Sequence, residues 1–478
     1  MVFSSLLFLS VFLPLFLLVY FLLPKKLSIK NNFLLLSSFL FYAWGEPKFV
    51  FLLFFTTIID FYLVKKMDTY EQPFYRKLFL CFPIMVNLGL LCYFKYFNFF
   101  IDNVNSVGGL INMQPIEISK IILPIGISFF TFESITYSVD VYRRVHKPLK
   151  NFWDYQVYII FFPKLIAGPI VRFHEIADQL VNHIDNETYK NRVDGFIRFA
   201  IGLGKKVLIA NVMSRQADAI FAMDNSHLTT TISWLGAFAY TLQIYFDFSG
   251  YSDMAIGISK MLGFRLPENF NNPYTSKSVT EFWKRWHITL GSWMKNYLYI
   301  PLGGNRVDKY RVYLNLFIVF LLSGLWHGAG WNFIFWGAYY GVFLVVEKIV
   351  FKKGERSSIR KFFGWVYTLI VVVVGWVFFR IDNIGTAFNF VKKMFSFDFN
   401  NDYVFITQPD FYYMFILAIF FSFFALNGKL NRFQERLFDG RISKIETFIL
   451  SGLGIACLFI CFVSLSGGLF NPFIYFKF

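Results

Sequence analysis

The chain has 478 residues, of which 56% are hydrophobic and 22% aromatic, and its formal net charge is +16 at pH 7. A water-soluble protein of this length could not bury so much apolar surface, and bilayer-length apolar runs recur along the chain, so the composition excludes a soluble protein. The basic residues cluster in short loops between the apolar runs, which argues against nucleic-acid binding and places those loops in the cytoplasm, beside anionic lipid.

The amino-terminal third is predicted to contain spans that alternate across the membrane. The first run lacks a basic leading region and is too long for a signal peptide, so it stays as a span. Lys25, Lys26 and Lys30 follow it, which places the amino terminus outside. The second run is too long for one span and breaks at 44–47, as a hairpin would. The predicted segments are 2–23, the hairpin 32–64, a span 78–93 that leads to an outer loop 102–114, and a return span 121–137.

The middle of the chain contains two segments that are not plain spans. The run 157–172 is interrupted by Pro163, Lys164, Gly168 and Pro169, which predicts a re-entrant element, because irregular backbone at membrane depth must be covered by protein or line a cavity. The segment 277–311 carries seven Lys or Arg against two acids and is rich in Trp and Tyr. That composition predicts helices at the cytoplasmic interface. Further helices are expected at 197–212 and 231–245.

The carboxyl-terminal part is predicted to be a series of spans joined by basic inner loops. The inner loops are 348–361 and 429–444, and the acidic, Asn-rich loop 381–410 is expected outside. The fold class is therefore all-α and polytopic, with roughly eleven to thirteen membrane-embedded segments in a single domain over 1–478. No internal repeat is visible, which argues against an inverted-repeat transporter. The spans are 312–325, 331–346, 363–379, 412–426 and 448–464.

His327 is the leading catalytic candidate because an ionisable residue in an apolar span is costly and is rarely present without a role. Nearby glycines are expected to clear space for a substrate, and flanking tryptophans to wall an apolar tunnel. A histidine can take a proton from an alcohol and return one to a leaving group, which suits acyl transfer. The alternative is a neutral histidine bonded to a neighbouring helix. The glycines are Gly324, Gly328 and Gly330, and the tryptophans are Trp326 and Trp331.

His287 is the second candidate, on a basic and aromatic segment. Lys284, Arg285 and Lys295 lie near it in sequence and are expected to hold phosphate groups. The alternative is an interfacial histidine on an amphipathic helix. A role beside His327 requires the fold to bring the two together, which their spacing does not show.

The stretch 245–254 places carboxylates directly after an apolar run, where each needs a partner. We interpret Asp247, Tyr251 and Asp253 as a polar lining of the reaction chamber. Helix capping by the serines of this stretch is the alternative. Glu133 and Asp60, within apolar runs, are expected to pair structurally.

Other motifs are assigned no chemistry. The four cysteines have no His or carboxylate neighbours, so we expect neither a metal site nor a disulfide framework. The run 202–206 lacks the spacing of a phosphate loop, and no nucleophile elbow or metal motif is present. The remaining histidines are expected to be solvated; they are His146, His174, His183 and His227.

Several motifs together resemble the membrane-bound O-acyltransferase family, and within it the bacterial branch of the alginate O-acetyltransferase membrane subunit and its peptidoglycan-acetylating relatives. The resemblance covers nearly the whole chain. The motifs are Phe41-Tyr-Ala-Trp44, Tyr93-Phe-Lys-Tyr96, Leu123-Pro-Ile-Gly-Ile-Ser128, Phe162-Pro-Lys-Leu-Ile-Ala-Gly-Pro169, Asn296-Tyr-Leu-Tyr-Ile300 and Leu302-Gly-Gly-Asn-Arg306.

The resemblance implies that His327 is the catalytic histidine and His287 the second motif histidine, within a helical bundle around a central tunnel. It implies a bacterial cytoplasmic (inner) membrane protein with no bound cofactor, which uses cytosolic acetyl-CoA as donor substrate. The implied acceptor is an exported polysaccharide, reached through an extracytoplasmic esterase-like partner. The alternatives are D-alanyl or other acyl transfer to an envelope polymer, and a non-enzymatic exporter of lipid-linked glycans with transmembrane acids at its transport site.

Overall fold

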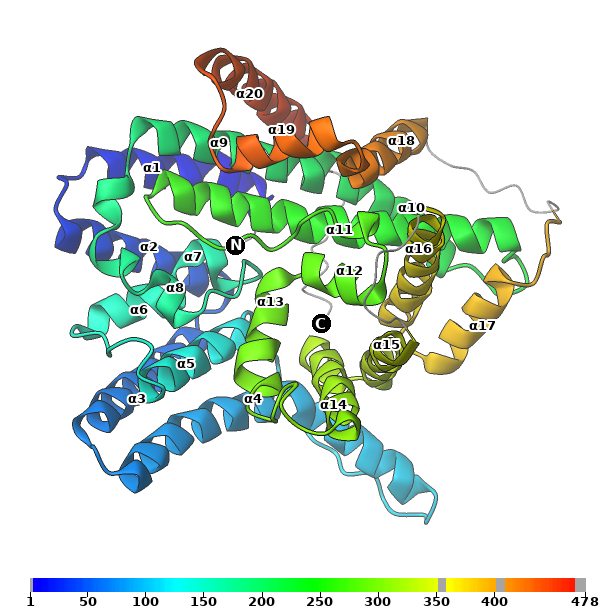
Figure 1. Cartoon of the computed structure of the whole chain (residues 1–478), viewed down its shortest axis with the longest axis horizontal. Helices are drawn as coiled ribbons and strands as arrows, with labels where there is room; N and C mark the ends of the chain where they lie inside the picture. The colour runs from blue at the N-terminus through cyan, green and yellow to red at the C-terminus, as the bar shows by residue number, and fades with distance from the viewer. Residues whose placement is uncertain (1–2, 351–357, 401–408, 469–478) are drawn as a thin grey trace. The chain divides into compact units, whose positions relative to one another are not determined.

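The computed structural model describes residues 3–350, 358–400 and 409–468 (Figure 1). Within these ranges the regular structure is helical, apart from one isolated β-bridge between Phe270 and Trp286, so the predicted all-α class is confirmed. The chain divides into two compact units, 1–189 with 259–267, and 190–258 with 268–478. The prediction of a single domain over 1–478 stays a prediction.

The first unit begins with a short π-helical turn and a helical hairpin, and continues through a long helix into a series of short helices. The hairpin turns between Gly45 and Phe49, close to the predicted break at 44–47. Its elements are η1 (Phe8–Phe12), α1 (Leu13–Leu22), α2 (Leu27–Gly45), α3 (Phe49–Thr69), α4 (Pro73–Gly109), α5 (Ile127–Tyr142), α6 (Phe152–Ile160), α7 (Phe162–Leu165), α8 (Phe173–Ile176), η2 (Gln179–Val181) and η3 (His183–Asn186).

The broken segment 157–172 is buried inside the first unit, as its irregular sequence predicts. α6 ends at Ile160, α7 is a single turn, and the residues after it run without helix to Arg172. Lys164 of α7 forms a fully buried ion pair with Glu133 of α5, and the second carboxylate oxygen of Glu133 accepts from Val171 N at 3.4 Å. The structural pairing expected for Glu133 is confirmed. Likewise, Asp60 accepts from Asn87 at 2.7 Å.

Two predictions for the first unit are wrong. The outer loop 102–114 begins inside α4, because an asparagine that favours a loop instead holds the following segment against the helix: Asn105 donates to Ile116 O at 3.1 Å and accepts from Ile116 N at 2.8 Å. His183 is buried rather than solvated, with Nδ1 3.0 Å from Leu262 O and Nε2 2.9 Å from Asn31 Oδ1. A buried imidazole needs partners for both nitrogens, and the fold supplies them.

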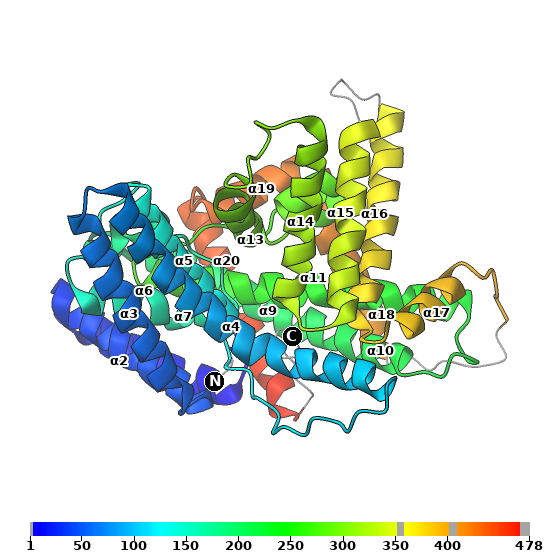
Figure 2. The same ribbon diagram turned by 90° about the horizontal axis from the view of Figure 1, so that it is seen from below.

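The second unit holds the remaining helices, and α14, α15 and α16 run side by side in it (Figure 2). Its elements are α9 (Tyr189–Gly204), η4 (Lys205–Ala210), α10 (Asn211–Phe221), α11 (Thr230–Met261, whose last turn belongs to the first unit), η5 (Pro273–Thr275), α12 (Val279–Arg285), α13 (Ile288–Trp293), η6 (Met294–Tyr299), α14 (Lys309–His327), α15 (Trp331–Val350), α16 (Ser358–Arg380), α17 (Ile384–Met394), α18 (Pro409–Phe423), η7 (Phe424–Leu426), α19 (Gly428–Phe438) and α20 (Lys444–Ser466).

Six helices of the described residues are long and apolar enough to cross a bilayer: α4, α14, α15, α16, α18 and α20. The five carboxyl-terminal spans predicted from the sequence fall in the last five of these. Residues 8–22 form a shorter apolar helix. The loop predictions are refined: 381–410 contains α17, and 429–444 contains α19. Residues 351–357 and 401–408 of the predicted loops lie outside the described residues.

Glycines let α14 and α15 pack closely. A methyl group on Gly324 would collide with the carbonyl oxygen of Phe333 and approach Gly337 Cα to 3.0 Å, and one on Gly328 would collide with the Phe333 ring. Small residues are the usual device for close helix contact in membranes. The expectation that these glycines clear space for a substrate is therefore wrong: they clear space for α15.

Replacing Gly324 with Ala should lower stability by about 1–3 kcal/mol, because the helices must separate to admit the methyl group. The matched control is Gly89→Ala in α4, where an added methyl meets no atom within 4 Å and where Ala is the better helix former. Thermal unfolding of the purified variants in detergent measures both. Equal melting temperatures would contradict the close packing.

Candidate active site

The site is built on a short antiparallel contact that holds α12 in place. Asn271 N donates to Arg285 O, and Ile288 N donates to Asn269 O, each at 2.9 Å, on either side of the Phe270–Trp286 bridge. At its other end, α12 is capped by Glu347 of α15, which accepts from Val279 N at 2.6 Å and Thr280 N at 2.9 Å. A carboxylate at a helix amino terminus satisfies free N–H groups and complements the helix dipole. α12 is thus fixed at both ends.

His287 lies at the break between α12 and α13, in the left-handed backbone region with φ +45°. A non-glycine residue adopts this conformation rarely, and the flanking hydrogen bonds hold it there. Its Nδ1 lies 3.1 Å from Asn269 Oδ1, and the ring packs edge-on against Phe248. Burial of the ring, and to a smaller extent the nearby His327, hold the pKa of His287 well below its usual range, so His287 is neutral at pH 7.

His327 is the last residue of α14 and is enclosed by aromatic rings. Its ring centroid lies 5.0 Å from that of Trp326 and 5.2 Å from those of Trp336 and Phe379. Trp326 also packs against His287, with centroids 6.0 Å apart. The structure therefore brings the two histidines together around Trp326, which the forty residues between them could not show.

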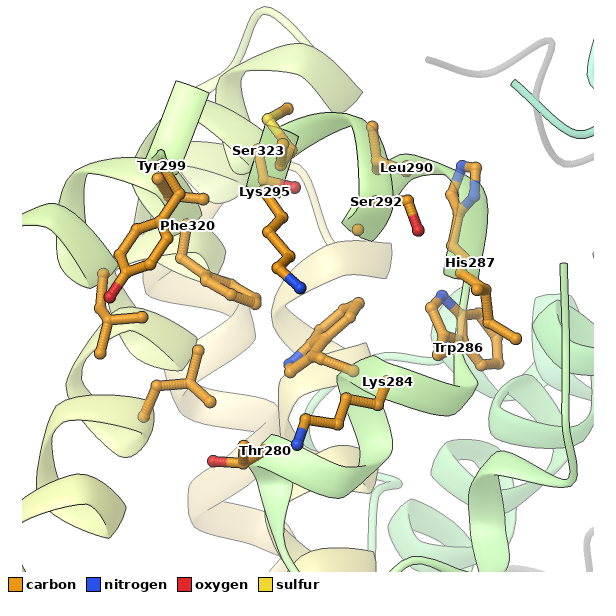
Figure 3. Close-up of a pocket in the computed structure, with 17 residues that line it drawn as sticks. Thr280, Lys284, Trp286, His287, Leu290, Ser292, Lys295, Tyr299, Phe320 and Ser323 are labelled. Atoms are coloured by element: carbon orange, nitrogen blue, oxygen red, sulfur yellow. The ribbon is translucent and has the colours of Figure 1, made fainter. Parts of the chain in front are cut away.

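A pocket of about 460 Å³ opens beside His287 (Figure 3). Its walls come from α12, α13, η6 and α14 and are mainly apolar. Figure 3 shows Lys295 extending into the pocket between Phe320 and His287, with Lys284 at its edge beside Thr280. His287 is part of the lining and His327 is not. The pocket therefore reaches the histidine pair through His287.

The basic residues predicted to hold phosphates separate into two kinds. Lys284 and Lys295 line the pocket, are exposed, and have no ion-pair partner within the described parts of the chain. Arg285 does not line it: its guanidinium pairs with Glu281 at 2.9 Å and donates to Asn271 O at 3.2 Å. Arg285 is held by its own helix and lies outside this pocket, so its assignment to substrate binding stays a prediction that the pocket does not support.

Asp247 and Tyr251 are buried but do not line this pocket. Asp247 forms an ion pair with Lys206 at 2.8 Å. Asp253 pairs with Arg198 at 2.6 Å and with Lys205 at 2.7 Å. The predicted polar lining is therefore a charge network that joins α11 to α9 and η4, where each buried carboxylate finds its partner. Lys205 and Lys206 belong to the run 202–206, which the sequence analysis rejects as a phosphate loop. Their ion pairs with Asp253 and Asp247 agree with that rejection.

Four residues of the site are missed by sequence reasoning. Asn269 lies in a polar stretch that is typical of a loop, and no pattern indicates its contact with His287. Trp283 lines the pocket, and Trp336 contacts His327; in an aromatic-rich chain neither stands out. Glu347 does carry a signal, since it is an acid directly after the apolar run of α15.

Comparison with known proteins places this architecture in a family. The model of the membrane-bound O-acyltransferase family matches residues 129–388, more than half of the chain and including both histidines. The chain belongs to the membrane-bound O-acyltransferase family. It is a multi-pass membrane enzyme of the O-acyltransferase class, with its histidine pair inside the matched region.

Bacterial relatives match most of this O-acyltransferase. It is 45% identical to the probable alginate O-acetylase of Pseudomonas aeruginosa over 83% of this chain and 75% of the relative. The probable alginate O-acetylase of Pseudomonas putida is 40% identical over the full length of both chains. The peptidoglycan O-acetyltransferase of Helicobacter pylori is 38% identical over 82% of this chain and 80% of the relative.

Nothing in the described part of the chain groups three or more His, Cys, Asp or Glu side chains in a way that could hold a metal ion. The cysteines Cys81, Cys92, Cys457 and Cys461 are free thiols. The chemical groups that the site offers are therefore the two imidazoles, the indole N–H groups and the two lysines.

Asp247→Asn should mainly destabilise the O-acyltransferase, because it leaves Lys206 as a buried charge with a weakened partner, at a cost of about 3–5 kcal/mol. Activity per folded molecule should remain within about twofold, and Asp247→Leu combined with Lys206→Met should recover part of the stability. Thermal unfolding and specific activity, each normalised to monodisperse protein, measure this. A stable variant without activity would restore Asp247 to the reaction chamber.

Proposed function

We propose that the protein transfers an acetyl group from acetyl-CoA to hydroxyl groups of an exported polysaccharide, with His327 as general base. The observation that carries the proposal is the histidine pair around Trp326, beside an apolar pocket that holds two lysines without ion-pair partners. The names of the relatives, alginate O-acetylase and peptidoglycan O-acetyltransferase, support acetyl as the acyl group and a polysaccharide as the acceptor.

The reaction needs a base, an acid and a dry environment, and the site offers all three. The acceptor hydroxyl attacks the thioester carbonyl while His327 takes its proton. The C–S bond then breaks, and the imidazolium returns the proton to the departing thiolate sulfur. The aromatic rings around His327 exclude water, so the thioester is protected from hydrolysis.

The pocket suits the donor. Its volume falls in the range of small-molecule sites, and its mainly apolar walls fit an extended pantetheine arm. Lys284 and Lys295 supply positive charge for phosphate groups at the exposed end, with the thioester then directed toward His287. Acetyl-CoA acts as a substrate in this proposal.

Donor and acceptor lie on opposite sides of the membrane in this proposal. Acetyl-CoA is charged and stays in the cytoplasm, whereas the polysaccharide is exported, so the acetyl group alone crosses. An extracytoplasmic esterase-like partner would complete the transfer to the polymer. The basic residues of α19 and the lysines after the first apolar run support a cytoplasmic-membrane orientation with the amino terminus outside.

The acidic residues within the apolar helices do not favour the alternative of a glycan exporter. An exporter would keep such acids available at a transport site. Glu133, Asp247 and Asp253 are each held in ion pairs instead. The chemistry of this chain is concentrated at the histidine pair.

His327→Ala should reduce acetylation of the polymer at least about 100-fold while the protein still accumulates in the membrane, because the base is lost. His287→Ala should lower it strongly. His146→Ala is the matched control, since that half-buried ring hydrogen-bonds only Asp178 and Lys147 among the described residues and packs against Phe173. Acetyl content of the polymer and immunoblots of membranes measure both quantities. Near wild-type acetylation by the His327 variant would refute the assignment.

Lys284→Met together with Lys295→Met should raise the KM for acetyl-CoA about tenfold or more and change kcat less, since phosphate contacts act alike in the ground and transition states. Arg285→Met is the matched control: an adjacent cation that lies outside the pocket. Donor titration on purified protein measures KM. An unchanged KM with a lower folded yield would leave both lysines structural and move the donor site elsewhere.

A further inference from the structure

The carboxamide of Asn269 lies among four hydrogen-bonding groups. Its Oδ1 accepts from Thr289 Oγ1 at 2.9 Å and from Thr289 N at 3.3 Å, and lies 3.1 Å from His287 Nδ1. Its Nδ2 donates to Ser252 Oγ of α11 at 3.1 Å. Asn269 is 1% exposed, so these contacts are made away from water.

These contacts fix which way the amide faces. The backbone N–H of Thr289 can only donate, so the amide oxygen must lie on that side, next to His287. A carboxamide oxygen can only accept, so His287 Nδ1 must carry a hydrogen and donate it. Because the imidazole is neutral, its other nitrogen, Nε2, then holds a lone pair and no hydrogen.

That lone pair is buried and has no hydrogen-bond partner among the described residues. An unpaired buried acceptor destabilises the fold, and the left-handed backbone of the same residue adds strain. Both costs fall on a residue in the wall of the pocket and beside His327. Such an acceptor is ready for a donor group that arrives with the substrate.

We propose that Asn269 is a positioning residue: it holds His287 in the form protonated at Nδ1, so that Nε2 accepts a hydrogen bond from a second hydroxyl of the acceptor sugar, next to the hydroxyl from which His327 removes the proton. The inference rests on the proposed function, since both hydroxyls are those of the acyl acceptor. The backbone N–H of Thr289 keeps Asn269 from turning over, and Ser252 Oγ accepts from the amide on its other side.

The groups that face His287 decide how its protonation responds to pH. α14 contributes His327 and Trp326, α11 contributes the Phe248 ring, and the segment before η5 contributes Asn269. Of these groups only His327 has an ionisable side chain. A carboxylate in place of the Asn269 amide would therefore be the dominant new influence on His287, and it would favour the imidazolium.

The test uses purified full-length protein and its pH–rate profile. Asn269→Ala should lower kcat about 10–100-fold with KM for the donor little changed, as expected when a group that orients a reacting imidazole is removed. Asn269→Asp should keep the Nδ1–H contact and retain more activity, but move the acidic limb of the profile to higher pH, because protonated His287 has no lone pair. Asn315→Ala is the matched control: this buried amide of α14 donates to Leu302 O, before the helix, so its loss should leave the acidic limb in place.

A double-mutant comparison and a substrate-free measurement complete the test. When His287 is already replaced by Ala, adding Asn269→Ala should lower kcat by a further factor of less than about two. The ¹⁵N shifts of the His287 ring, assigned by their loss in His287→Ala, should show hydrogen at Nδ1. An additive loss, an unmoved acidic limb in Asn269→Asp, or hydrogen at Nε2 would each overturn the role of Asn269. Failure of the wild-type protein to transfer acetyl groups would overturn the proposed function instead, and the ¹⁵N shifts would still decide the tautomer.

Discussion

The close contact of α14 with α15 is the constraint on which the site depends. Gly324 and Gly337 allow the two helices to approach until Trp336 of α15 lies against His327 of α14. The same approach places Glu347, at the far end of α15, where it caps α12. α12 ends at Arg285, two residues before His287, so both histidines owe their positions to one pair of packed helices.

Three buried acids away from the pocket are paired with cations, whereas the two lysines that line the pocket have no ion-pair partner among the described residues. Away from the pocket, Glu133, Asp247 and Asp253 are each matched with a cation, and these pairs cross-link helices within each unit. At the pocket, two lysines and one imidazole nitrogen are left for something else to bind. The two lysines are exposed, so their charge is open to an anionic ligand, and the imidazole nitrogen is a buried acceptor in the wall of the same pocket.

The sequence alone predicts the class, the five carboxyl-terminal spans and both histidines, because apolar length and a costly ionisable residue are local properties. It misassigns features whose meaning depends on a neighbour distant in the chain. A glycine such as Gly324 leaves room for any close neighbour, and only the fold shows that α15 occupies the room beside it. Arg285 and Lys284 are adjacent cations, and only the orientation of a two-turn helix separates them. No sequence pattern singles out Asn269, because its role depends on its contact with the His287 ring.

We propose that the acyl donor lies in the pocket formed by α12, α13, η6 and α14, with its acyl group beside the histidine pair. A cryo-EM structure with a non-hydrolysable thioether analogue of acetyl-CoA tests this most directly. We expect density for the phosphates at Lys284 and Lys295, and density for the acyl carbon beside His287 and His327. Ordered analogue bound elsewhere, with this pocket empty, would contradict it.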